Sequence, residues 1–116
     1  MPDSIDDLTQ ALRRFAQARD WGKFHSPKNL ASALVVEAAE LLEPFQWLSE
    51  ADSRTLPPDK LQAVADEMAD VLLYLVQLSS ALQVDLLAAA RAKLAHNALK
   101  YPVDRAHGNA RKYDEL

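Results

Sequence analysis

The chain has 116 residues, of which 49% are apolar and 26% charged, so it is most simply one globular domain large enough to bury a core. Its formal net charge of −4 excludes the broad basic surface that a nucleic-acid polymer needs, and the absence of cysteine excludes disulfides and thiolate zinc sites. The N-terminus is acidic without an apolar secretory segment, and polar residues interrupt the apolar stretch 71–90. We therefore expect a cytoplasmic protein with no membrane partner.

Four helices are predicted in chain order, because Ala and Leu are abundant and glycine and β-branched residues are few. The first begins at an N-cap, Ser4 or Asp3, and ends near residues 19–21. The second runs over about 30–43 and ends before Pro44, since a proline inside a helix costs about 3 kcal/mol.

The third helix spans about 59–82 and is the longest, and the fourth runs from an N-cap at Asp85 to Tyr101. We divide the chain into a helical domain, 1–102, and a polar tail that is expected to be extended, 103–116. The second and third helices are apolar around most of their surface, which indicates burial against another subunit. The prediction is an all-α, four-helix-bundle-like fold assembled as an oligomer.

Two acidic pairs stand out, Glu37 with Glu40 on the second helix and Glu67 with Asp70 on the third. Residues three apart share a helix face, and the segments around both pairs contain no Lys, Arg or His. An antiparallel packing of the two helices would bring the pairs face to face. A solvated acidic face is the alternative, but exposed faces usually mix charge signs. A divalent cation explains the pattern better, and four oxygen ligands suit Mg²⁺, with Mn²⁺ possible.

Two other interpretations of the acidic residues are weaker. A di-iron bundle requires Glu-x-x-His, and no glutamate here has a histidine three residues later. The neighbouring acids Glu43 and Asp66 are expected to be solvated or to contact the ligands, rather than to bind metal themselves.

Several short sequence motifs occur along this chain in the same order as in a known protein family. They are Arg19-Asp20-Trp21, Phe24-His25, Pro27-Lys28-Asn29-Leu30, Glu37-Ala38-Ala39-Glu40-Leu41, Phe45-Gln46-Trp47, Glu67-Met68-Ala69-Asp70-Val71-Leu72, Tyr74-Leu75, Lys93, Asn97, Lys100-Tyr101-Pro102 and Arg111-Lys112-Tyr113. Together they resemble the MazG-like, all-α nucleotide pyrophosphohydrolases, and among these the dCTP pyrophosphatase branch. The resemblance covers nearly the whole chain.

The resemblance implies that residues 1–102 form a catalytic domain, which hydrolyses a pyrimidine dNTP, dCTP or a modified dCTP, between its α and β phosphates. The products would be a dNMP and pyrophosphate, the role would be clearing unwanted nucleotides, and the assembly would be a homodimer or homotetramer. Mg²⁺ would be held by Glu37, Glu40, Glu67 and Asp70, and Glu37 or Glu40 would also position or deprotonate the attacking water.

The resemblance also implies contacts with the substrate. Trp21, His25 and Trp47 would recognise the base, and Tyr74 would pack on the sugar. Packing is the commoner role of a tryptophan, and a place in the core would explain Tyr74 equally well. Phosphate contacts would come from a set on the fourth helix: Lys93, Asn97, Lys100 and Tyr101. The plain alternative for that set is a solvated helix end, where cations are favoured anyway.

Two residues depart from the family pattern. Leu12 stands where related proteins have a histidine near the base, and Pro44 interrupts the turn that joins Glu40 to Trp47. Two hypotheses from other classes remain open at this point: a non-catalytic nucleotide- or metal-binding regulatory module, and a purely structural helical bundle.

Overall fold

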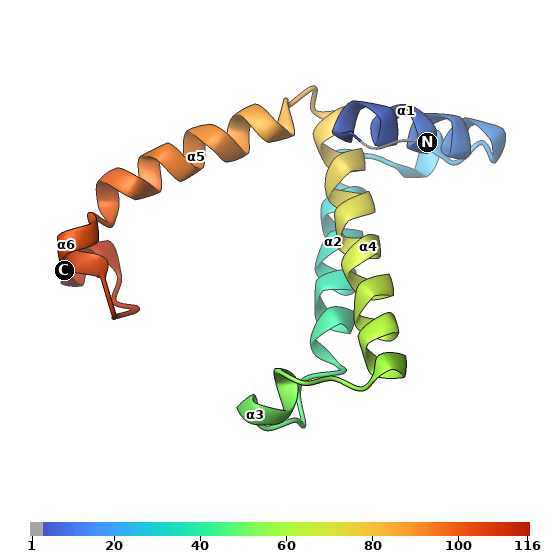
Figure 1. Ribbon diagram of the computed structural model, residues 1–116. Coiled ribbons are helices and arrows are strands. Elements are labelled where there is room, and N and C mark those ends of the chain that lie inside the picture. Colours follow the sequence, from blue (N-terminus) through green and yellow to red (C-terminus); the bar gives the residue numbers. More distant parts are fainter. Residues whose placement is uncertain (1–3) are drawn as a thin grey trace. The chain divides into compact units, whose positions relative to one another are not determined.

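The structure, a computed structural model, describes residues 4–116 (Figure 1). Every regular element in this part of the chain is helical, so the predicted all-α class is confirmed. The elements are α1 (Ile5–Ala18), η1 (Gly22–Phe24), α2 (Pro27–Leu42), α3 (Glu50–Ser53), α4 (Pro58–Ala81), α5 (Leu86–Lys100), α6 (Val103–Ala106) and η2 (Tyr113–Glu115), where η denotes a 3-10 helix. The chain forms two compact units, one ending at Val84 and the other comprising Asp85–Leu116.

The helices begin where the sequence supplies a capping side chain. Ser4, Ser26 and Asp85 each accept a hydrogen bond from the backbone N–H three residues further on, at 3.1, 3.2 and 3.0 Å. Each bond satisfies an amide group that has no partner inside its helix. Pro58 occupies the first turn of α4, where its missing N–H is not needed. The alternative N-cap, Asp3, lies outside the described residues.

The first unit is built on α2 and α4, which lie side by side and antiparallel (Figure 1). Its core lies between them, where Leu30, Val64 and Val76 are only 2%, 6% and 0% exposed. Helix α1 packs against α4. Helix α2 ends at Leu42, before Pro44, as the sequence predicts.

The end of α1 is a tight reversal that places the next aromatic residues. Asp20 adopts a left-handed backbone conformation with φ 53°. The N–H of Trp21 donates to the Ala16 carbonyl at 3.0 Å, and the N–H of Asp20 donates to Gln17 at 3.2 Å. This pattern is a Schellman motif, and aspartate is one of the few residues that tolerate it in place of glycine. The chain then passes through η1 to His25.

The second unit corrects the expectation of an extended tail. Residues after Pro102 form α6 and η2 instead. The Pro102 carbonyl accepts hydrogen bonds from two following N–H groups, which begins α6. The Tyr113 ring meets the Tyr101 ring edge-on at 6.3 Å and lies 4.5 Å from the Lys100 ammonium. Local contacts of this kind leave no periodic pattern in the sequence, so they could not be predicted from it. The division into a helical domain, 1–102, and a tail, 103–116, stays a prediction.

Two further findings concern the polar linker before α4 and the apolar character of the helices. The polar linker before α4 contains the short helix α3, capped by the Ser49 hydroxyl. Among residues 4–116 no single helix has both the length and the apolar character to cross a membrane.

Candidate metal centre and adjoining cavity

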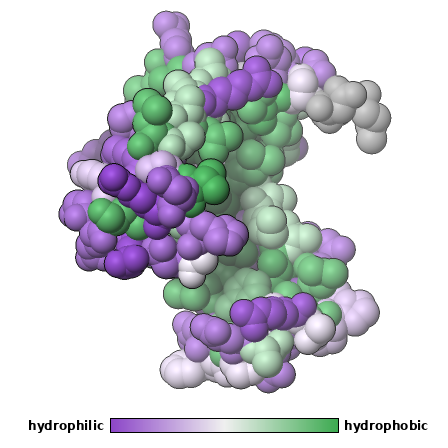
Figure 2. Space-filling model, turned by 60° about the vertical axis from the view of Figure 1, so that its left-hand side comes forward, coloured by the Kyte–Doolittle hydropathy of each residue, from purple (hydrophilic) through white to green (hydrophobic). Residues whose placement is uncertain are grey.

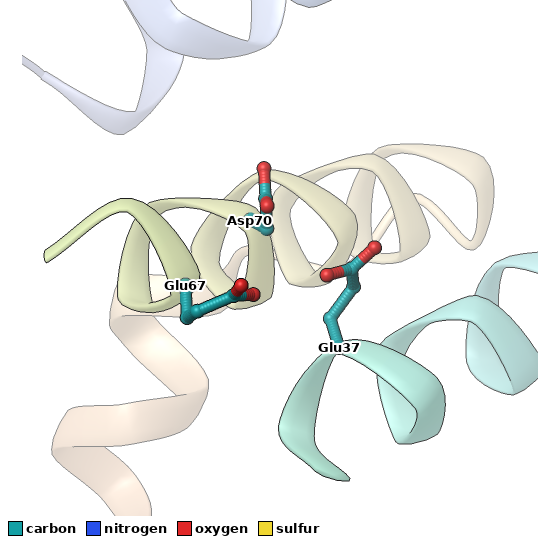
Figure 3. A group of neighbouring side chains, drawn as sticks. All are labelled: Glu37, Glu67 and Asp70. Atoms are coloured by element: carbon teal, nitrogen blue, oxygen red, sulfur yellow. The ribbon is translucent and has the colours of Figure 1, made fainter. Parts of the chain in front are cut away.

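Carboxylates from α2 and α4 meet in the first unit. Glu37 extends from α2 towards α4, which carries Glu67 and Asp70 (Figure 3). One oxygen of each of these three residues lies within 4.8 Å of the other two, and all three side chains are half-buried. Glu40, one turn after Glu37, borders this group closely enough to interact with both glutamates. The antiparallel helix pair therefore brings the two acidic pairs of the sequence together.

The proximity of these acids changes their proton affinity. The pKa of Glu37 is raised from its ordinary value of 4.5 to about 7, and burial is the largest cause. A hydrogen bond with Glu40 and the negative charges of Glu40, Asp70 and Glu67 act in the same direction. The pKa of Glu67 is also raised, by burial first and then by the charges of Glu40 and Asp70. A group of acids with raised pKa values is one that lacks a compensating positive charge.

Residues 4–116 supply no such charge to these acids. Among the residues that the structure describes, the one ion pair joins Lys23 to Asp20, at 3.0 Å, and involves none of these acids. In the same residues, Glu37 Oε2 and Glu67 Oε2 are buried without a hydrogen-bond partner. Buried polar atoms are costly in this state, and a divalent cation with oxygen ligands would satisfy both. The residues present therefore fit a divalent metal ion.

A cavity of about 310 Å³ adjoins the acidic group, and Asp70 belongs to both. Its α4 wall includes Asp70, Tyr74 and Gln77, which follow one another at helical spacing along one face. Trp21 and His25 line it from the segment around η1, and four residues of α1 complete it: Leu8, Ala11, Leu12 and Phe15. Three of the four predicted base and sugar contacts, Trp21, His25 and Tyr74, therefore line one cavity beside the carboxylates.

The aromatic rings in this cavity hold one another in place. The Phe15 and Trp21 rings meet at 5.7 Å and 70°, and the Trp21 and His25 rings at 6.4 Å and 75°. The Arg19 guanidinium lies 3.6 Å from the centre of the Phe15 ring. Asn29 donates a hydrogen bond to the Phe24 carbonyl at 3.0 Å, which ties this segment to the start of α2. Edge-to-face contacts of this kind stabilise ring orientation.

The structure does not bring every predicted site residue to this cavity. Trp47 follows α2, is 88% exposed and is absent from the cavity lining, so its contact with a base stays a prediction. The predicted phosphate contacts belong to the second unit, which is described by itself: Lys93, Asn97, Lys100 and Tyr101. Their roles likewise stay predictions.

Comparison with known proteins identifies the family. The profile of the MazG-like family matches residues 33–116. The chain belongs to the MazG-like family. It is 41% identical to dCTP pyrophosphatase 1 of Mus musculus and 39% identical to that of Homo sapiens, in each case over 97% of this chain and 68% of the relative. A crystal structure of a pyrophosphatase from Archaeoglobus fulgidus is similar, with a TM-score of 0.76 and 37% identity over 88% of this chain and 95% of that one.

These matches confirm two predictions made from the sequence: membership of the MazG-like family, and its enzyme class, the nucleotide pyrophosphatase hydrolases. The structure also shows cavity residues that sequence reasoning missed. Phe15 and Gln77 both line the cavity, and neither is among the site residues predicted from the sequence. A signal for Gln77 existed, since it lies seven residues after Asp70 and therefore on the same helix face.

Proposed function

We propose that this MazG-like protein hydrolyses dCTP, or a related pyrimidine dNTP, between the α and β phosphates to give a dNMP and pyrophosphate. The proposal rests on one observation: Asp70 belongs both to the cluster of three carboxylates and to the lining of the aromatic cavity. A nucleotide has the same two parts, a polyanionic end and an aromatic end. The similarity to dCTP pyrophosphatase 1 supports dCTP as the substrate.

The proposal gives the carboxylates two tasks. Glu37, Glu67 and Asp70 lie together and would hold Mg²⁺, with Mn²⁺ as an alternative of similar chemistry. Bound Mg²⁺ would neutralise phosphate charge and lower the pKa of the attacking water. Glu40 borders the group, and we assign it to orienting that water or accepting its proton, while it also contributes charge to the site. Glu37 is the other candidate for this role.

The cavity residues have the task of orienting the substrate. Trp21 offers a ring face for base stacking and one N–H donor, and His25 adds a polar group at the same wall. Tyr74 lies one turn beyond Asp70, which is where the sugar of a nucleotide with its phosphates at the carboxylates would pass. The residues of α1 that line the cavity are apolar and would exclude water from the base. Correct positioning of this kind supplies much of the rate enhancement in phosphoryl chemistry.

The test is turnover of a panel of dNTPs and NTPs with Mg²⁺, resolving pyrophosphate from orthophosphate. Pyrophosphate release, strongest with dCTP or a 5-substituted dCTP, is expected. Glu40→Gln should lose turnover while still binding the metal, and Glu67→Gln should bind the metal more weakly. Asp66→Asn is the matched control, because this exposed acid of α4 bonds to Gln62 instead. Orthophosphate as the first product would refute α–β cleavage.

We also propose that the protein acts as a homodimer or homotetramer, in the cytoplasm, in clearing unwanted nucleotides. Apolar side chains remain exposed on the two central helices of the first unit: Val35, Val36 and Leu42 of α2, and Leu61, Met68 and Leu72 of α4. Figure 2 shows such apolar surface beside polar regions on one face of the molecule. A second copy would cover part of it. Light scattering coupled to size-exclusion chromatography measures the mass, and a monomer at micromolar concentration would contradict this assembly.

A further inference from the structure

The cavity beside the carboxylates contains one neutral polar side chain whose amide orientation is fixed by a hydrogen bond to the backbone. Gln77 lines this cavity on α4, and it also lines a second cavity of about 200 Å³ that shares Leu12 and His25 with the first. Its Nε2 donates a hydrogen bond to the Leu73 carbonyl, 3.2 Å away in the preceding turn. Its Oε1 accepts no hydrogen bond from any residue in the described range 4–116.

This bond fixes the orientation of the Gln77 amide and therefore the place of its acceptor oxygen. A free glutamine amide is ambivalent, because rotation by a half turn exchanges its donor and acceptor. Here the rotation would break the bond to Leu73, so the oxygen keeps its place as an acceptor, while one of the two Nε2 hydrogens is committed to Leu73 and the other stays available. The other neutral polar groups of the lining do not present a fixed acceptor. The Trp21 N–H can only donate, whereas the Tyr74 hydroxyl and the neutral His25 ring can do either.

The position of Gln77 along α4 matches the far end of a nucleotide. Asp70 and Gln77 are seven residues apart on one helix face, which corresponds to about 10 Å along the axis. A substrate with its phosphates at the carboxylates and its sugar at Tyr74 would therefore direct the edge of its base towards Gln77. Leu12, which lines the same cavity from α1, offers no hydrogen bond to compete for that edge.

The geometry points to Gln77 as a specificity-determining residue that selects bases carrying an exocyclic amino group at this edge. This inference rests on the proposed function. The Oε1 of Gln77 accepts a hydrogen bond from the amino group at C4 of cytosine. Uracil and thymine carry a carbonyl oxygen there, so two acceptors would face each other and both would be left unpaired. A site built to accept a substrate N–H rejects the analogue that lacks it for this reason.

The experiment compares kcat/KM for dCTP and dUTP, which differ at this edge and share their sugar and phosphates. The wild-type protein should prefer dCTP. Gln77→Met, which keeps the length of the side chain and removes the acceptor, should reduce the dCTP-to-dUTP ratio about tenfold or more. Gln77→Glu, which keeps an acceptor, should retain more of the preference. Gln62→Met makes the same change at an exposed position of α4 and should leave the ratio unaltered.

The outcomes separate this inference from the proposed function. A folded Gln77→Met protein with the wild-type ratio, or a wild-type protein without preference for dCTP, would overturn the role of Gln77 while leaving pyrophosphate release intact. Absence of pyrophosphate release with every nucleotide would overturn the function instead. The role of Gln77 would then be decided by binding of dCMP and dUMP to the same variants, measured as the shift in unfolding temperature, because binding to the native state raises it. Circular dichroism checks that each variant is folded.

Discussion

Binding of Mg²⁺ should release about one proton per chain at pH 6 and few at pH 8. With a pKa of about 7, Glu37 is about nine-tenths protonated at pH 6 and about one-tenth protonated at pH 8. A carboxyl group must lose its proton to bind a metal ion, so binding and proton release are coupled. The pKa of Glu67 is also raised, by burial and by its acidic neighbours, which acts in the same direction.

The same coupling sets the pH dependence of affinity. Below pH 7 the proton on Glu37 competes with the metal, so the association constant for Mg²⁺ should rise by up to about tenfold per pH unit and then level off. Isothermal titration calorimetry at pH 6, 7 and 8, in buffers with different ionisation enthalpies, gives both the affinity and the number of protons released.

Two variants give this measurement its control. Glu37→Gln has no proton to release at this position, so its proton count at pH 6 should fall by about one, and its affinity should also be lower. Asp66→Asn removes an exposed acid from α4 and should behave as the wild type. Equal proton release at pH 6 and pH 8 in the wild type would refute the reasoning, since Glu37 would then be ionised in the metal-free chain.

Three further predictions follow from the same structure. Because the pKa of Glu37 is raised from 4.5 to about 7, its contribution to metal-free stability is complete below pH 4.5 and is lost as the pH rises to about 7. The unfolding temperature without metal should fall across that window, and a fall of equal size in Glu37→Gln would contradict this assignment. Val76→Ala should lower the free energy of unfolding in urea by about 2–3 kcal/mol, since Val76 is fully buried. Val103→Ala, at a position 80% exposed, should change it by less than about 0.5 kcal/mol, and equal losses would place the core elsewhere. Trp21→Ala should raise KM for the dNTP about tenfold through lost stacking, whereas Phe24→Ala, outside the cavity lining, should not; an unchanged KM in Trp21→Ala would remove it from the site.

Local features of the fold were predictable because they depend on residues close together in the sequence. Ser4 and Asp85 cap their helices as expected, and α2 ends before Pro44. The predictions failed where short contacts replace periodicity. The tail residues form α6 and η2, since hydrogen bonds to the Pro102 carbonyl and the edge-on contact between Tyr101 and Tyr113 are enough to order a few residues.

The sequence by itself determined the helices and the pairing of acids on two helix faces, because helical period and capping are local properties. It also carried the family, through the order of its motifs. Only the tertiary structure decided that Asp70 belongs both to a cluster of carboxylates and to the lining of an aromatic cavity. That arrangement requires α2 to pack antiparallel on α4 and the reversal at Asp20 to turn Trp21 and His25 towards the same face of α4. The donor atom that Gln77 commits to Leu73 is likewise a matter of side-chain geometry, which no spacing in the sequence specifies.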